Sequence, residues 1–145
     1  MSSFAQGVYQ PRNPAKYVGR GAPRYRSGWE LSFFRFCDEN PAVMEWASEA
    51  ITIKYRHPFT QKVTTYIPDI FIRYQDQHKR IHTEIIEIKP RKQSMIEGKM
   101  NERERMTVAI NHAKWAAARA WCQRAKIEFR VLTEDSLFHN GGKKR

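Results

Sequence analysis

The sequence predicts an α/β domain in which a mixed sheet, a three-strand meander plus one crossover strand, is flanked by helices. Apolar and polar residues alternate in four short segments, which is the period of a half-buried strand. In two longer segments, apolar residues recur every three or four positions, which is the period of an amphipathic helix. The predicted elements, in chain order, are a helix over 28–39, strands over 50–55, 66–74 and 83–89, a helix over 101–124 and a strand over 126–132.

Charge and size limit the classes of function. The 145 residues suit one domain with one core. The 26 lysines and arginines outnumber the 15 acidic residues, giving a formal net charge of +11. This balance predicts a polyanionic partner, nucleic acid ahead of a membrane, although a basic protein can also be merely soluble. The sequence has no apolar run as long as a membrane span and no hydrophobic signal region, so no membrane partner is expected.

The cysteines and histidines give no sign of a zinc site. Cys37 and Cys122 lie within apolar helical patterns and form no Cys-x-x-Cys pair, and the five histidines lack zinc-ligand spacing. We therefore expect two buried thiols in a reducing cytoplasm, or in a particle assembled in one.

Composition divides the chain into an N-terminal arm (residues 1–27), a core domain (28–137) and a basic tail (138–145) that is expected to be mobile. The arm is rich in proline and glycine and lacks acidic residues, so an extended conformation is expected. Its cations would lie on DNA phosphates and its tyrosines against bases or sugars; docking on a protein partner is the alternative. The cations are Arg12, Lys16, Arg20, Arg24 and Arg26, interleaved with Tyr9, Tyr17 and Tyr25.

Glu30, in the first predicted helix, has two candidate roles. With Ser27 it has the spacing of a capping box, in which the glutamate accepts a hydrogen bond from the cap amide. It also shares the apolar stripe of Phe33, Phe34 and Cys37, which points it inward, and an inward carboxylate needs a partner. We favour a place in a functional site over the cap. Residues 41–49, after this helix, are expected to form a turn and an irregular segment.

The segment from Tyr66 to Pro90 carries the clearest functional signal, because it is predicted to form a hairpin with charged residues at one end. Asp69 and Glu87 lie nine residues on either side of His78, so they face each other if the hairpin is symmetric about that residue. Glu87 and Lys89 are two residues apart, which places both on one face of their strand. Two carboxylates and a lysine should therefore converge.

Such a group of charges is costly unless a cation or a proton stabilises it. Mg²⁺ suits it, because this ion prefers oxygen ligands, is held by one or two carboxylates and keeps water and phosphate as further ligands; Mn²⁺ can substitute. Lys89 could then orient a water or stabilise charge on a phosphate. A Pro-Asp pair or a Glu-x-Lys triplet alone is usually structural. Their order in two consecutive strands makes phosphodiester hydrolysis the prediction.

More basic residues follow this hairpin. Arg91 and Lys92 come directly after the second strand and would hold a phosphate or belong to a solvated loop. Lys114 lies at the edge of the apolar face of the long helix, where it can snorkel or point toward the site. The last strand, 126–132, can return beside the strand of Glu87 by a helical crossover.

Pro68 and Asp69 in one strand, with Glu87 and Lys89 in the next, resemble the signature of PD-(D/E)XK nucleases. The order of helix, three strands, helix and strand is similar to the restriction-endonuclease-like core of that superfamily. The resemblance implies that Glu30, Asp69, Glu87 and Lys89 are catalytic. Asp69 and Glu87 would hold Mg²⁺, Glu30 would support or share that metal, and Lys89 would serve the attacking water.

A closer resemblance covers nearly the whole chain, from about residue 7 to residue 137, and is to the head-completion nuclease family of T-even-like tailed phages. The N-terminal run Pro11 to Tyr17 and the helix segment Asn111 to Trp115 carry it together with the site residues. The core is also similar to the N-terminal domain of the Tn-seven-type transposon end-cleaving endonuclease.

These resemblances imply a metal-dependent DNA endonuclease that acts on the end of the packaged genome in phage head completion. Double-stranded DNA and phage portal or neck proteins would be its partners, in the host cytoplasm during assembly or in the head–neck region of the virion. The alternative is a structural neck protein that binds the portal or the DNA end without turnover. A cellular transposition or repair nuclease is a third hypothesis.

Overall fold

The computed structural model describes residues 6–136. Its elements, in chain order, are β1 (Gly7–Val8), the 3-10 helix η1 (Pro14–Lys16), β2 (Arg24–Tyr25), α1 (Gly28–Glu39), β3 (Val43–Ser48), β4 (Ile53–Arg56), β5 (Val63–Tyr66), β6 (Ile70–Gln75), β7 (Ile81–Ile88), the 3-10 helix η2 (Arg91–Gln93), α2 (Glu102–Ala125) and β8 (Glu128–Leu132).

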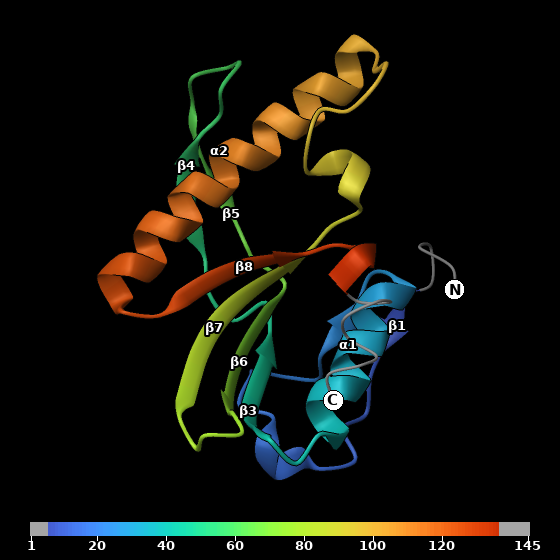
Figure 1. Cartoon of the computed structure of the whole chain (residues 1–145), viewed down its shortest axis with the longest axis vertical. Helices are drawn as coiled ribbons and strands as arrows, with labels where there is room; N and C mark the ends of the chain where they lie inside the picture. The colour runs from blue at the N-terminus through green and yellow to red at the C-terminus, as the bar shows by residue number, and fades with distance from the viewer. Residues whose placement is uncertain (1–5, 137–145) are drawn as a thin grey trace.

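Four strands form a mixed sheet in the order β3-β6-β7-β8. The β3–β6 and β6–β7 pairs are antiparallel, and β8 is parallel to β7. The long helix α2 connects β7 to β8, and Figure 1 shows α1 and α2 on different sides of the sheet. The prediction of an α/β fold with a mixed sheet and a crossover strand is therefore confirmed.

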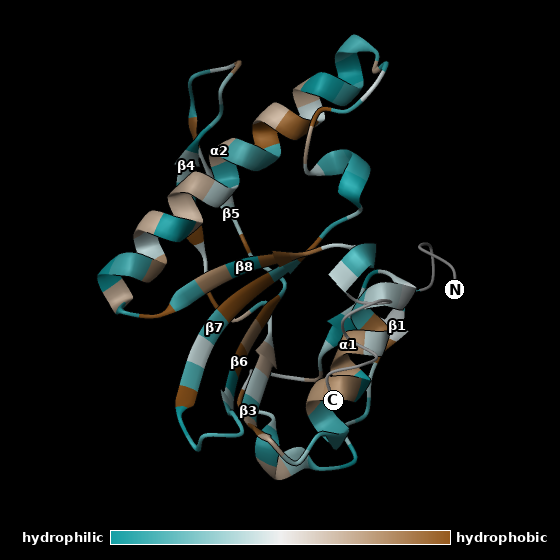
Figure 2. Cartoon of the chain, in the orientation of Figure 1, coloured by the Kyte–Doolittle hydropathy of each residue, from teal (hydrophilic) through white to brown (hydrophobic). Residues whose placement is uncertain are grey.

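Strand alternation in β7 separates a hydrophobic core from the site. Ile86 and Ile88 point toward α1, where they pack with Phe34 and Trp46 in a core of fully buried side chains. Glu87 lies between the two isoleucines and so faces the opposite side of the sheet. Figure 2 shows that the end of β7 is hydrophobic, whereas the turn that precedes the strand is hydrophilic.

The β6–β7 hairpin has the predicted register. Its pairs run from Ile70 with Ile86 to Gln75 with Ile81, so the hairpin is symmetric about His78. Asp76 shapes the turn, because its Oδ1 accepts hydrogen bonds from the backbone amides of His78 (2.8 Å) and Arg80 (3.0 Å). The residue that precedes β6 is Asp69, which this register brings to Glu87.

The predicted meander is wrong in its first strand. The edge strand beside β6 is β3, within the segment 41–49 that was expected to be irregular. A register shift between Val43 and Glu45 interrupts its alternation, which explains why a period-two pattern does not reveal it. The predicted strand 66–74 is also two strands, because Pro68, which has no N–H to donate, separates β5 from β6.

The predicted strand 50–55 becomes half of a separate ribbon. β4 and β5 form a two-stranded sheet, in register from Ile53 with Tyr66 to Arg56 with Val63. The inner face of this ribbon packs against α2 through Ile53, Tyr55 and Tyr66, together with the buried Trp115. The ribbon extends beyond the four-stranded sheet along α2 (Figure 1).

The N-terminal segment differs from the expected extended arm. β1 pairs with β2, and Tyr17 forms a parallel bridge to Trp46 at the edge of the sheet. The aromatic ring of Tyr17 lies 4.7 Å from that of Trp46, edge to face. Tyr9 and Tyr25 also pack against this core, so all three tyrosines are partly buried in the protein, which differs from the expected contact with DNA bases or sugars. The hydrophobic core supplies the apolar surface that the segment alone lacks.

The helix ends and the cysteines agree with the sequence. Asn101 and Glu104 form a capping box at the start of α2, and Lys126 ends the helix in the left-handed conformation (φ 61°). Cys37 and Cys122 are buried free thiols, as predicted. Within residues 6–136 no helix is both long and apolar enough to cross a bilayer. The predicted basic tail, 138–145, lies outside the described residues.

Candidate active site

Asp69 and Glu87 meet where β6 begins and β7 ends. Oδ2 of Asp69 accepts a 2.7 Å hydrogen bond from the backbone amide of Ile88, the residue that follows Glu87. This bond extends the pairing of the two strands by one step and fixes the Asp69 carboxylate beside the Glu87 carboxylate. Glu87 is only 4% exposed. The predicted convergence of these two acids is therefore present in the fold.

The environment disfavours two negative charges at this point. Burial, followed by the charges of Glu87 and Glu30, raises the pKa of Asp69 well above its usual range. Burial also raises the pKa of Glu87, against the lowering effects of Tyr66 and Lys89. Two partly desolvated carboxylates with raised pKa values favour a cation as a further neighbour.

Lys89 supplies one positive charge. Its Nζ lies 3.9 Å from Oε2 of Glu87, and its side chain remains 30% exposed. The backbone amide of Lys89 donates a 3.0 Å hydrogen bond to the carbonyl of Leu132 in β8, which holds this residue at the end of the sheet. An accessible ammonium group thus lies beside a buried carboxylate.

Comparison with known proteins agrees with this geometry. Residues 40–134 match the family model of the TnsA-like endonuclease N-terminal domain. The chain belongs to this endonuclease family. It is also similar to the head completion nuclease of Enterobacteria phage T4, with 35% identity over 90% of this chain and 92% of the phage protein. The predicted nuclease of the head-completion type is thereby confirmed.

Glu30 makes the capping contact considered for it, and its place in the functional site stays a prediction. Its Oε1 accepts a 3.0 Å hydrogen bond from the backbone amide of Arg26, and its own amide donates to Oγ of Ser27. The capping interaction is therefore present, shifted by one residue from the standard box. Burial raises the pKa of Glu30, and its charge in turn raises the pKa of Asp69, which indicates that the two acids interact.

Tyr66 is a site residue that the sequence patterns did not reveal. Its hydroxyl donates a 2.7 Å hydrogen bond to Oε1 of Glu87, across from the side that faces Lys89. A tyrosine at the end of a strand is typically a core residue, and Tyr66 is one as well. The signal was its position two residues before the Pro-Asp pair, which becomes meaningful only when the break between β5 and β6 is known.

Lys114 points toward the site from α2, one of the two orientations expected for it. Its Nζ lies 5.6 Å from the ring centre of Tyr66 and 5.9 Å from that of Tyr55. Burial and then the charge of Lys89 lower the pKa of Lys114, while Glu87 and Asp69 raise it. A second cation therefore shares the electrostatic field of the two carboxylates.

The remaining predicted DNA-binding residues have different surroundings. Lys16 donates from Nζ to the carbonyls of Asp38 and Asn40 at the end of α1, both at 2.9 Å, so its ammonium group stabilises the helix end. Arg26 forms a salt bridge with Glu49 (3.0 Å). Arg12, Arg20, Arg24 and Lys92 are exposed.

Arg91 belongs to an exposed cluster of ions next to the site strand. Its guanidinium contacts Glu97 at 2.7 Å and Asp135 at 3.0 Å, and its backbone amide donates to Glu134 at 2.7 Å. These contacts hold the loop after β7 against the segment after β8. A phosphate at Arg91 would compete with two carboxylates, so its DNA-binding role stays a prediction.

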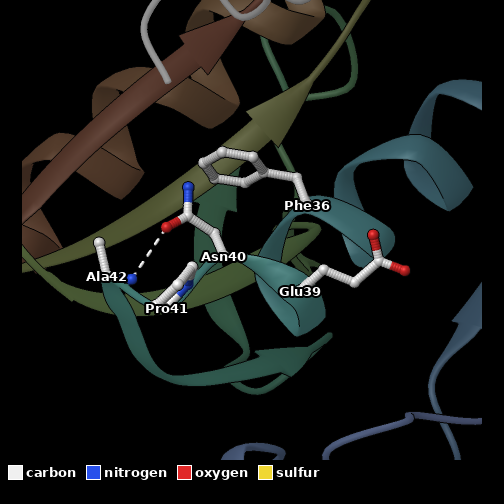
Figure 3. Close-up of a pocket in the computed structure, with 5 residues that line it drawn as sticks. All are labelled: Phe36, Glu39, Asn40, Pro41 and Ala42. Atoms are coloured by element: carbon white, nitrogen blue, oxygen red, sulfur yellow. Dashed lines mark hydrogen bonds between the residues drawn. The ribbon is translucent and has the colours of Figure 1, made fainter.

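A surface pocket lies elsewhere on the molecule. Figure 3 shows its lining at the carboxyl end of α1, where Oδ1 of Asn40 accepts from the backbone amide of Ala42 at 2.8 Å. Glu39, the acidic residue of this pocket, is separated from Glu30 by about 13 Å of helix at 1.5 Å per residue. The pocket therefore does not belong to the carboxylate site.

Proposed function

We propose that this chain hydrolyses phosphodiester bonds in DNA with Mg²⁺, held by Asp69 and Glu87, and with Lys89 beside the attacking water. The paired carboxylates at the ends of β6 and β7 are the observation that carries the proposal. The PD-(D/E)XK assignment rests on the same residues, which have the order and placement of that signature. Substrate DNA agrees with the net charge of +11.

The residues present fit a magnesium ion. Within residues 6–136 no cluster of three or more histidine, cysteine or acidic side chains forms a metal site. Two carboxylates are nevertheless sufficient for Mg²⁺, which fills its other positions with water and substrate phosphate. Hydrogen bonds from Ile88 and Tyr66 occupy Oδ2 of Asp69 and Oε1 of Glu87. Each carboxylate keeps lone pairs beyond these bonds, so Asp69 and Glu87 would hold the ion.

The chain itself would contribute positioning and charge. Bound Mg²⁺ would polarise the scissile phosphate and lower the pKa of a water. Lys89 lies on the accessible side of Glu87, where its ammonium group can orient that water or stabilise charge on the phosphate. Glu30 is assigned a supporting role through Asp69, since its carboxylate also accepts the Arg26 amide.

The biological setting follows from the phage relative. A head completion nuclease acts during virion assembly, and we propose the same stage for this chain, in the cytoplasm of the host. The substrate there would be the end of the packaged genome, and portal or neck proteins would be its neighbours.

The decisive experiment is a cleavage assay on linear and circular duplex DNA in Mg²⁺ or Mn²⁺, with EDTA as a control. We expect Glu87→Gln to reduce cleavage by at least about 10²-fold. Glu128→Gln, an exposed glutamate of the neighbouring strand β8, is the matched control and should cut normally. DNA binding by the wild-type protein without cleavage in either metal would refute the proposal and favour the structural neck role.

A further inference from the structure

We propose that the outer face of the β4–β5 ribbon binds the sugar-phosphate backbone of the duplex next to the cleaved bond. The inference rests on the proposed function, since it concerns the DNA on which that site acts. It assigns a partner to a surface that none of the catalytic residues uses.

The two faces of the ribbon differ in what they contact. The inner face is buried against α2. On the outer face, Lys54 pairs with Thr65 and Arg56 with Val63, and all four side chains are exposed. Strand alternation therefore commits one face to the core and leaves the other accessible to a ligand.

The exposed side is positively charged without compensation. No acidic residue lies between Glu49 and Asp69 in the sequence. Two cations of this stretch, Lys54 and Arg56, lie on the outer face, and a third, Lys62, lies in the exposed turn that joins the two strands. Within residues 6–136 none of the three forms a salt bridge. This differs from Arg26 and Arg91, which are paired with acids. An uncompensated row of cations on a ribbon attracts a polyanion.

The ribbon is attached directly to the catalytic site. Its last residue, Tyr66, donates its hydroxyl to Glu87. Lys62 precedes Tyr66 by four residues, which corresponds to about 14 Å along an antiparallel strand at 3.4 Å per residue. Roughly the same length holds four base-pair steps of B-DNA at 3.4 Å per step. The ribbon therefore has the reach to contact the backbone over about four base pairs from the cleaved phosphate.

Hydrogen bonds within the turn of the ribbon hold it in one conformation, which favours such a contact. Arg56 donates a 2.7 Å hydrogen bond to the carbonyl of Gln61, and the His57 ring accepts from the amide of Phe59 at 3.2 Å. Phe59 and Val63 are 49% and 58% exposed. Exposed apolar side chains also suit a neck protein as the occupant, but the three unpaired cations favour DNA.

The test is the salt dependence of DNA binding. Lys54→Gln with Lys62→Gln removes two charges at exposed positions, and Arg35→Gln with Arg80→Gln removes two exposed charges elsewhere. Binding to a fluorescently labelled linear duplex is measured by anisotropy in a Glu87→Gln background, where the DNA stays intact. Thermal unfolding confirms that each variant is folded, and Lys54→Arg with Lys62→Arg restores the charge.

We expect the ribbon variant to bind more weakly and its slope of log K against log salt to become shallower by about 1.8, since each phosphate contact contributes about 0.9. The charge-restoring variant should keep the wild-type slope. Equal slopes for the ribbon and control variants would overturn the inference. If the ribbon variant also loses binding to a purified neck or portal protein, that protein and not DNA occupies the ribbon. If the wild type cleaves DNA but the ribbon variant keeps the wild-type salt dependence, the proposed DNA contact of the ribbon is overturned and the proposed endonuclease activity is not. If the ribbon variant has a shallower salt dependence but the wild type does not cleave DNA, the endonuclease activity is refuted and the DNA contact of the ribbon is supported.

Discussion

The hydroxyl of Tyr66 donates a 2.7 Å hydrogen bond to Oε1 of Glu87, which joins the β4–β5 ribbon to the strand that carries the proposed metal ligand. The bond uses one oxygen of the carboxylate and directs the other toward Lys89. Partners of this kind orient a ligand and tune its affinity for the metal. We therefore infer that Tyr66 positions the Glu87 carboxylate.

The first prediction concerns this bond. Tyr66→Phe should raise the Mg²⁺ concentration needed for half-maximal cleavage by about 10-fold or more. Because Tyr66 lowers the pKa of Glu87, its loss should also move the acid limb of the pH–rate profile to higher pH. Tyr55→Phe removes a hydroxyl from the same ribbon and should change neither property. An unaltered Mg²⁺ requirement in Tyr66→Phe would argue against the positioning role.

The second prediction separates chemistry from binding at Lys89. Lys89→Gln should lower kcat by about 10²–10³-fold, because the ammonium group would act on charge that develops in the transition state. DNA affinity in EDTA should change little, since this lysine already neighbours a carboxylate. Lys99→Gln, at an exposed position in the loop before α2, is the control. A variant that loses affinity while keeping kcat would show that Lys89 only binds the backbone.

The third prediction follows from the raised pKa of Asp69. The Asp69 carboxyl holds its proton more tightly in the folded state than in the unfolded state. The protonated acid therefore contributes stability below the ordinary pKa of about 3.9, and this contribution is lost as pH rises. At neutral pH without metal, the charged acid is therefore destabilising. Asp69→Asn keeps an acceptor for the Ile88 amide and should raise the free energy of unfolding by the order of 1 kcal/mol in EDTA.

Urea denaturation measures this gain, which should disappear below about pH 4. Mg²⁺ should stabilise the wild type and leave Asp69→Asn nearly unchanged, because a ligand stabilises only the state that binds it. The Glu128→Gln variant provides the reference for loss of an exposed carboxylate. Destabilisation by Asp69→Asn at neutral pH would mean that the charged form is structurally required.

The central hairpin could be predicted because its information is local. Asp76 forms the turn with its own neighbours, and alternation on both sides then places Asp69 opposite Glu87. Helix α1 likewise begins at Ser27 through a cap encoded within four residues. Site residues that depend on this hairpin were therefore accessible from sequence.

The sequence-based predictions fail where the structure depends on contacts between residues that are far apart in the sequence. β3 contains a register shift, so its buried residues do not alternate, and its identity as a strand depends on pairing with β6. The site role of Tyr66 depends on a residue 21 positions away. The N-terminal segment has a composition typical of disorder, but Asp38 and Trp46 hold it in place.

The last prediction tests that attachment. Asp38 is fully buried and accepts hydrogen bonds from the Tyr9 hydroxyl (2.5 Å) and the backbone amides of Arg12 (2.7 Å) and Asn13 (3.0 Å). Asp38→Ala leaves these donors without their acceptor and should lower the free energy of unfolding by about 3 kcal/mol in urea denaturation. Glu39→Ala, at the exposed neighbouring position, should stay within about 0.5 kcal/mol of the wild type.

The pH dependence provides an independent check on Asp38. Burial raises its pKa, but the hydrogen bonds outweigh burial and lower it overall. A lowered folded pKa contributes stability above the ordinary value of about 3.9 and loses it as pH falls. The stability difference between the wild type and Asp38→Asn should therefore shrink as pH falls below about 4. If the difference is constant from neutral to acidic pH, the carboxylate charge does not hold the N-terminal segment, and packing of Tyr9 and Tyr17 must do so.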